Sequence, residues 1–110
     1  MKWYNNLYLS AQMQPDAKKV IRKIKRESYT PDVYLITISS TPGNILEIIP
    51  SYELLQKGYP KEELHVIGLS YGWLEAAELV REIVDEVYQV TGGLDVISYL
   101  RGKWRDESWK

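Results

Sequence analysis

The chain has 110 residues, enough for one domain, and its 45% apolar and 26% charged residues are ordinary for a protein with a hydrophobic core. There is no cysteine, so the composition excludes disulfides, thiolate metal sites and cysteine nucleophiles, and it fits a reducing compartment. The net charge of −1 excludes a surface that is basic all over, the common pattern among nucleic-acid-binding domains. There is no signal-peptide pattern and no apolar run near the roughly 20 residues of a membrane span, so we expect a cytoplasmic protein with no membrane partner.

The first third of the chain predicts a strand and a basic helix. Residues 3–9 carry alternating aromatic and polar side chains that predict a strand, and residues 15–28 predict a helix. Pro15 suits a first-turn position, and Asp16 complements the helix dipole. The apolar stripe of this helix is narrow and consists of Val20, Ile21 and Ile24. Residues 29–32 predict a turn, because the residue before a proline is disfavoured in a helix.

The middle of the chain predicts a buried strand, a loop and a short helix. Residues 33–39 are mostly β-branched, aliphatic or aromatic and carry no charge, which predicts a strand covered on both faces, as in a parallel sheet. A loop over residues 40–44 follows. Residues 45–49 fit either a short extended segment or an early helical turn. A helix is expected over about 50–57, ended by Gly58.

The last part of the chain predicts a second buried strand over residues 64–69 and a long amphipathic helix over 72–90, which stops at Gly92. The apolar positions of this helix are Trp73, Ala76, Ala77, Val80, Ile83, Val84 and Val87, and five acidic residues line its other side. A short helix is expected over 94–100. The polar tail, residues 101–110, is either flexible or docks on a partner.

These elements predict a single α/β domain over residues 1–110, with a small mixed or parallel sheet of two to three strands and helices packed on it. Strands 33–39 and 64–69 would be parallel neighbours joined by a right-handed helical crossover, and residues 3–9 would add a third strand. In that arrangement the loops after both central strands lie at the same edge of the sheet, where open α/β sheets bind ligands.

Polar side chains follow both strands at this expected edge, beside the start of the helix over 72–90, which favours an anion. They predict a small polar or anionic ligand, and the candidate residues are Ser39, Ser40, Thr41, Gly43, Asn44, Glu47, Ser70, Tyr71 and Gly72. Neither a GxGxxG nor a phosphate-binding loop motif is present. The alternative is that residues 41–44 only form a turn and that Ser70 or Gly72 caps the helix.

Charge is unevenly distributed along the chain. Residues 1–30 carry seven bases and two acids, whereas residues 31–95 carry three bases and eleven acids. The basic helix predicts contact with nucleic acid, because such clusters release counterions from phosphate backbones. Its candidate residues are Lys18, Lys19, Arg22, Lys23 and Arg26, with Lys25 beside them. A solvated, ion-paired helix explains the same cluster.

Other chemistries are not expected. Residues 68–72, GLSYG, match the GxSxG pattern of a nucleophile elbow, but the chain is too short for an α/β-hydrolase and its only histidine, His65, precedes the serine. One histidine and no cysteine leave no zinc site. The glutamates of the last long helix fit a solvated face better than an acid/base pair. We therefore expect no catalytic residue, no cofactor and no metal.

Nine tyrosines and four tryptophans with no phenylalanine supply rings with polar tips, which suit half-buried positions and interfaces. The leading hypothesis is a small accessory or interaction protein that forms a homo-oligomer or binds a protein partner. Binding of a small ligand at the sheet edge and binding of nucleic acid are the alternatives.

The segments GNILEIIPSYELLQKGYP and LHVIGLSYGWLEAAELVREIVDEVYQVTGGLDVISYL resemble a family of small, uncharacterised bacterial cytosolic proteins with the same strand–loop–helix order. The resemblance covers roughly residues 33–100. It implies a compact α/β fold and a cytoplasmic location, but no activity.

Overall fold

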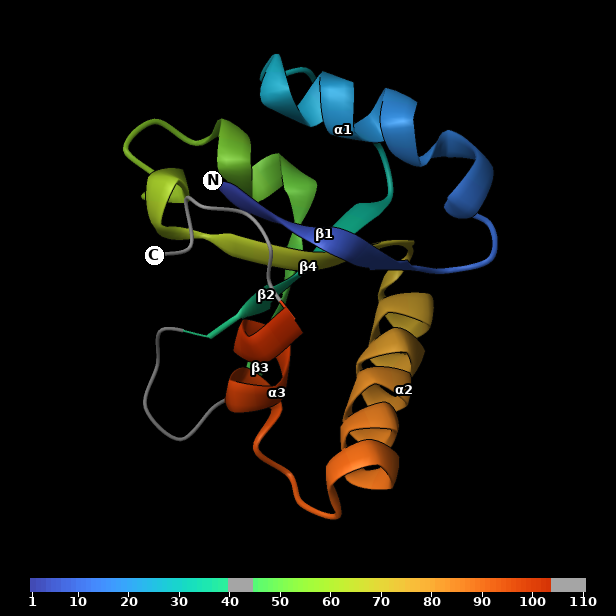
Figure 1. The fold of residues 1–110 in the computed structure, drawn as a ribbon. Coiled ribbons are helices and arrows are strands. Elements are labelled where there is room, and N and C mark those ends of the chain that lie inside the picture. Colours follow the sequence, from blue (N-terminus) through green and yellow to red (C-terminus); the bar gives the residue numbers. More distant parts are fainter. Residues whose placement is uncertain (40–44, 104–110) are drawn as a thin grey trace.

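Four strands form one mixed sheet with helices on both faces (Figure 1). The computed structural model describes residues 1–39 and 45–103. The strands are β1 (Lys2–Leu9), β2 (Val33–Ile38), β3 (Leu46–Pro50) and β4 (His65–Tyr71). The helices are α1 (Ala17–Lys25), α2 (Trp73–Thr91) and α3 (Val96–Lys103), with short 3₁₀ turns η1 (Gln14–Asp16), η2 (Ser51–Leu55) and η3 (Lys61–Glu63). The predicted α/β class is confirmed, but the sheet has four strands instead of two to three.

The strand order is β1-β4-β2-β3, and the directions differ from the prediction. β1 is parallel to β4, but β2 is antiparallel to both β3 and β4. The prediction that residues 33–39 and 64–69 form parallel neighbours was therefore wrong. The reason is β3: residues 45–49, left ambiguous between strand and helix, pair back along β2 and reverse the chain before it crosses to β4.

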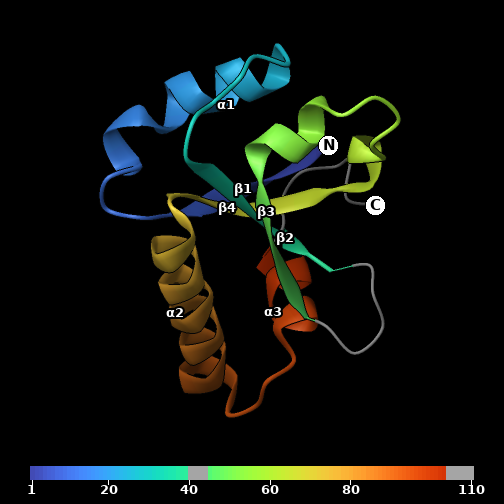
Figure 2. The same ribbon diagram turned by 180° about the vertical axis from the view of Figure 1, so that it is seen from behind.

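The apolar character of β2 has a cause other than parallel pairing, because helices cover both faces of the sheet. On the α1 face, the core contains Met13, Val20, Ile24, Val33, Leu35, Leu54, Val66 and Leu69. On the face covered by α2 and α3, it contains Tyr4, Ile36, Ile67, Leu79, Ile83, Val87, Val96 and Leu100. Figure 2 shows α2 and α3 together on the side of the sheet opposite α1. Successive β2 residues thus enter different cores, as strand alternation requires.

The expected helix over 50–57 is replaced by the end of β3 and the 3₁₀ turn η2. Pro50 has extended angles, φ −67° and ψ 137°, so it cannot begin an α-helix here. Ser51 is buried and fixed to Thr30: their hydroxyl oxygens lie 2.6 Å apart, and Ser51 Oγ donates to the Thr30 carbonyl at 2.9 Å. This buried polar pair joins the start of η2 to the turn before β2.

The ends of α2 agree better with the prediction. The predicted left-handed glycine at the end of α2 is confirmed, because Gly92 has φ 76° and ψ 4° and its N–H donates to the Tyr88 carbonyl. At the other end Gly72 is the N-cap residue, whereas Ser70 lies inside β4 and does not cap the helix. α3 extends to Lys103, three residues beyond the expected end, and residues 104–110 of the predicted tail lie outside the described residues.

Candidate functional site

The predicted ligand site at the sheet edge is not brought together. Because β2 and β4 are antiparallel, Ser39 at the end of β2 and Gly72 after β4 lie at opposite ends of the sheet. Ser39 donates a hydrogen bond to Glu47 on β3 at 2.6 Å, so these two predicted residues do meet. Of the other candidates, Ser40, Thr41, Gly43 and Asn44 lie outside the described residues. The described members of the set therefore form two separate groups.

The second group consists of Ser70, Tyr71 and Gly72. Tyr71 and Gly72 make hydrogen bonds within the fold. Tyr71 Oη donates to Asp16 Oδ2 at 2.7 Å, and this bond, aided by burial, raises the pKa of the Tyr71 phenol. The backbone N–H of Gly72 donates to the carbonyl of Asp32 at 2.7 Å. A hollow of about 90 Å³ lies beside Tyr71 and is lined by Lys19 and Lys23 among others. That volume is far below the several hundred Å³ of an ordinary ligand pocket.

The GxSxG string at residues 68–72 has a structural explanation. Ser70 is fully buried within β4, so its hydroxyl is not presented at an exposed turn. A Cβ on Gly68 would lie 3.0 Å from the backbone oxygen of Tyr8, so glycine allows β1 to approach β4 closely. His65 lies at the start of the same strand, opposite Lys2 of β1, and burial lowers the pKa of its imidazole. In these positions the string is the end of a buried strand followed by the N-cap of α2.

A polar cluster joins β1, α2 and α3 and was not predicted. Glu86 Oε2 accepts hydrogen bonds from Tyr8 Oη at 2.6 Å and from Tyr99 Oη at 2.8 Å. Lys103 Nζ lies 4.6 Å from the centre of the Tyr99 ring. Burial, together with the bond to Glu86, raises the pKa of the Tyr8 phenol. Glu86 was assigned to a solvated helix face, and no local pattern links it to Tyr8, 78 residues away.

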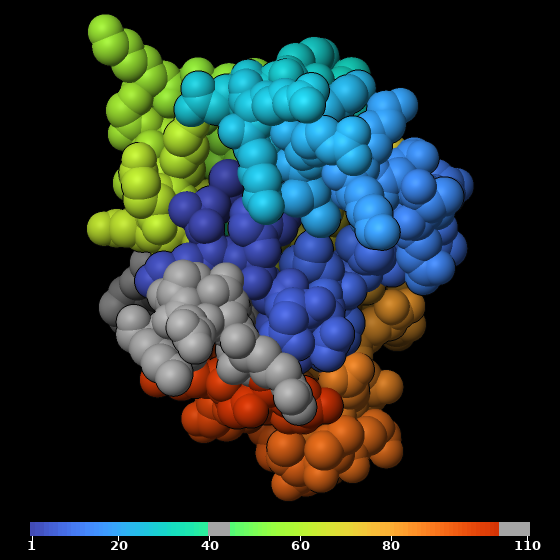
Figure 3. All heavy atoms as spheres, turned by 45° about the horizontal axis from the view of Figure 1, so that its top comes forward, coloured from blue at the N-terminus to red at the C-terminus, as the bar shows by residue number. Residues whose placement is uncertain are grey.

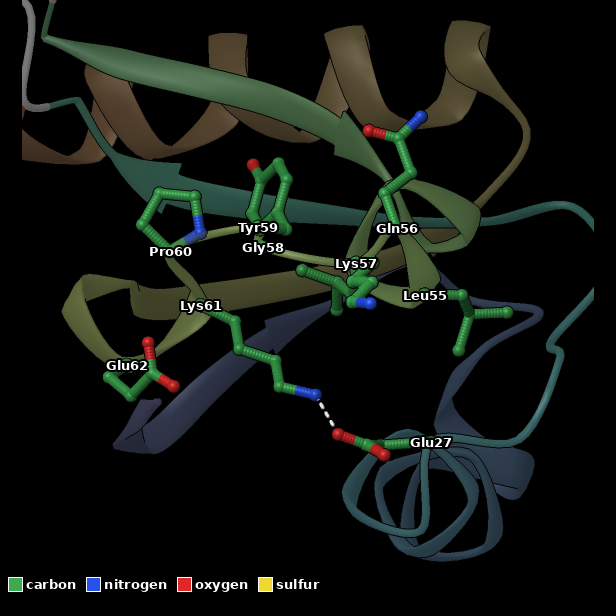
Figure 4. Close-up of a pocket in the computed structure, with 10 residues that line it drawn as sticks. Glu27, Leu55, Gln56, Lys57, Gly58, Tyr59, Pro60, Lys61 and Glu62 are labelled. Carbon is green, nitrogen blue, oxygen red and sulfur yellow. Dashed lines mark hydrogen bonds and ion pairs between the residues drawn. The ribbon is translucent and has the colours of Figure 1, made fainter.

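A hollow of about 760 Å³ lies where η2 leads through residues 56–60 to η3 (Figure 4). Its side chains are mostly exposed, and Figure 4 shows the Lys61 ammonium directed at the Glu27 carboxylate, with which it forms an ion pair. None of the charged side chains that line it is buried. Within residues 1–39 and 45–103, no group of acidic residues and histidine is arranged to hold a metal ion. This hollow has none of the convergent buried polar groups of a small-molecule site.

The basic helix presents a continuous charged surface. Ala17, Val20 and Ile24 of α1 are buried against the sheet. The outward side of α1 and its C-cap residue, Arg26, together carry six exposed bases, which we call the basic face: Lys18, Lys19, Arg22, Lys23, Lys25 and Arg26. Figure 3 shows α1 lying across the outer surface of the molecule. In the part of the chain that the structure describes, no carboxylate lies within 4.0 Å of any of these six groups, so the predicted ion pairing is not found. Solvation of the helix is confirmed.

Large apolar side chains are exposed along α2. Leu74 is 80% exposed, and Trp73, predicted on the apolar stripe, is 55% exposed. Tyr88 and Val90 are also exposed near the end of the helix. By contrast Ala76, Ile83 and Val87 are buried as predicted, together with Leu79. α2 therefore has more apolar surface than its own domain covers.

Comparisons of the chain with protein-family models, with curated proteins and with solved structures find no match. The resemblance of residues 33–100 to small bacterial cytosolic proteins therefore stays a prediction. Among the described helices, none is long and apolar enough to cross a membrane.

Proposed function

We propose that the protein is a small interaction protein that binds nucleic acid, without sequence preference, through the basic face of α1. The observation that supports this best is the state of its six bases: all are exposed, and none has a carboxylate partner within 4.0 Å among the described residues. Cations that are already paired with carboxylates must lose those partners before they contact phosphate, and here no such cost arises. Lys25 has another contact that an anion would compete with, because its ammonium lies 5.8 Å from the centre of the Trp3 ring. The predicted cytoplasmic location is compatible with this role and is itself a prediction.

The size of the basic face sets the kind of binding to expect. Nine helical residues span about 13 Å, which suits contacts with only a few successive phosphates. Affinity should therefore be modest and strongly dependent on salt, because each phosphate contact releases counterions. Tyr29, four residues beyond α1, is 63% exposed and offers a ring on which an unpaired base can stack. Single strands should accordingly bind better than duplexes.

The rest of the molecule limits binding to this face. The described acidic residues are concentrated elsewhere, and α2 carries five of them on the opposite side of the sheet. A polyanion is therefore attracted to α1 and repelled by α2, although the net charge is only −1. This arrangement answers the objection that nucleic-acid-binding domains are usually basic overall.

Fluorescence anisotropy with a labelled random single strand tests the proposal. We expect binding at low salt, and for the variant R22E/K23E/R26E a loss of at least tenfold in affinity and a reduction of about 2 in the salt slope. The variant K57E/R81E/R101E makes the same change in net charge outside the basic face and should retain most of the affinity. Circular dichroism checks that both variants fold.

Two results would refute the proposal. Absence of binding at low salt is one, and equal losses in the two triple variants is the other, because it would show an effect of net charge alone. Binding to heparin with no preference for nucleic acid would reassign the basic face to another class of polyanion.

A further inference from the structure

The outer edge of β3 is unpaired in the part of the chain that the structure describes. β3 is last in the strand order and hydrogen-bonds only to β2. The Ser39 N–H donates to the Ile45 carbonyl at 3.0 Å, and the pairs along an antiparallel ladder alternate between bonded and non-bonded. It follows that Leu46 and Ile48 direct their N–H and C=O groups outward, as does the Pro50 carbonyl. Such an edge is a template for another strand.

This edge is only weakly protected against pairing, with a proline at one end. Charged side chains normally blunt exposed edges, but the only charged residue of β3 is Glu47, and it is engaged by Ser39. Ile48 pairs with Ile36, whose side chain lies in the core beneath α2, so Ile48 also projects on the α2 face. Leu46 and Ile48 are both only partly buried. Apolar surface therefore continues from the edge of β3 onto the face of the sheet that α2 and α3 cover.

One flank of α2 adds to this apolar surface. Its residues recur every three or four positions and are Trp73, Ala77, Val80, Val84 and Tyr88, which we call the apolar flank. The opposite flank faces β1, because Glu86 bonds Tyr8 and because Glu75 and Glu82 line a hollow with Leu9. The apolar flank consequently faces the β3 side of the molecule, and α2 does contact both β2 and β3. No acidic residue lies on it.

We infer that the chain forms a two-fold symmetric homodimer in which β3 pairs antiparallel with β3 of a second copy and the apolar flanks of the two α2 helices become buried. A second copy fits because both surfaces are self-complementary. An antiparallel pair of identical edges satisfies both rows of backbone groups. The acidic flanks of the two α2 helices point away from each other, so five acids per helix do not oppose association.

Pro50 and Glu47 select the register. If Ile48 lies opposite Ile48 of the second copy, Leu46 lies opposite Pro50, whose missing N–H costs only one hydrogen bond on each side of the axis. Glu47 then faces Ile49 of the second copy. A shift that centres the pair on Glu47 would place two carboxylates directly opposite each other, which is unfavourable. The structure thus assigns Ile48 to the two-fold axis.

The chain has no cysteine, so a single cysteine is a clean probe of this axis. Residues opposite each other on paired strands have Cα atoms about 5.5 Å apart, within the range that a disulfide bridges. We expect Ile48→Cys to form a covalent dimer under mild oxidation much faster than Ser98→Cys, an exposed control on α3. Equal rates for the two variants would overturn the inference.

Light scattering coupled to size-exclusion chromatography measures the oligomeric state directly. The unmodified chain should elute with the mass of a dimer, and Ile48→Pro should be monomeric, because the outward N–H that it removes is not used by β2. Tyr88→Glu should weaken the dimer at least tenfold, whereas Leu55→Glu, an exposed apolar residue on the α1 face, should not. A monomeric unmodified chain at its highest soluble concentration would refute the dimer even if Ile48→Pro failed to fold.

Discussion

Gly72 holds a backbone conformation that other residues adopt only with strain. Its φ of 76° and ψ of 152° lie in a region that is essentially restricted to glycine. Gly92, at φ 76° and ψ 4°, is in the left-handed helical region, which asparagine also tolerates. Both residues have open space where a Cβ would be added, so any cost of substitution comes from the backbone alone. The two glycines at the ends of α2 therefore have different requirements.

Substitution of the two glycines by alanine separates these requirements. We expect Gly72→Ala to lower the free energy of unfolding by about 2–3 kcal/mol. Gly92→Ala should lower it by only about 1 kcal/mol, and Gly92→Asn by less. Denaturant unfolding monitored by circular dichroism measures each difference. Equal costs for both alanine variants would show that the turn at Gly72 relaxes to an ordinary conformation.

At the scale of elements, the sequence predicted the helices and strands that have strong local patterns. It did not predict how the strands pair. β1, β2, β4 and α2 were predicted within one or two residues, because alternation and helical periodicity are local properties. β3 was ambiguous, since four apolar residues around a single glutamate fit strand or helix equally. That one element decides the direction of β2 relative to β4, and so the predicted ligand site was lost with it. The basic face, which depends only on helical spacing, was predicted.

The contacts of Glu86 are a second feature that the sequence could not predict. A glutamate that follows Asp85 directly and Glu82 by four residues looks solvated, and its role depends on where β1 and α3 pack. In the structure it holds both elements through Tyr8 and Tyr99. Because these phenols donate to the carboxylate, the contact requires them to be protonated.

Removal of the Tyr8 hydroxyl tests this connection by its pH dependence. Burial and Glu86 raise the pKa of Tyr8 above the ordinary 10.0, so its contribution to stability is complete below pH 10.0 and is lost as the pH rises above that value. Tyr8→Phe should cost about 1 kcal/mol at neutral pH and make the alkaline loss of stability shallower. Tyr52→Phe, at an exposed position, should change neither. An unchanged alkaline slope in Tyr8→Phe would show that other tyrosines govern it.

Considered as a whole, the molecule separates its surfaces by the faces of the sheet. The basic face lies on one side, and the acids and apolar flank of α2 lie on the other. In the proposed dimer the two-fold axis passes beside Ile48 and is perpendicular to the sheet. The α1 faces of both copies would then lie on the same side of the joined sheet. The two basic faces of a dimer would then lie on the same side and be available to one polyanion.

The combination predicts an effect of nucleic-acid length. A strand of about 10 nucleotides is within the usual size of one site, and one of about 40 should contact both basic faces of a dimer. We expect the unmodified chain to bind the longer strand at least about tenfold more tightly, because the second contact is intramolecular. Ile48→Pro should bind the short strand with unchanged affinity but lose most of that gain. If Ile48→Pro keeps the full gain, the longer strand is bound by independent monomers; if it loses the short strand as well, the edge of β3 contributes to the binding site itself.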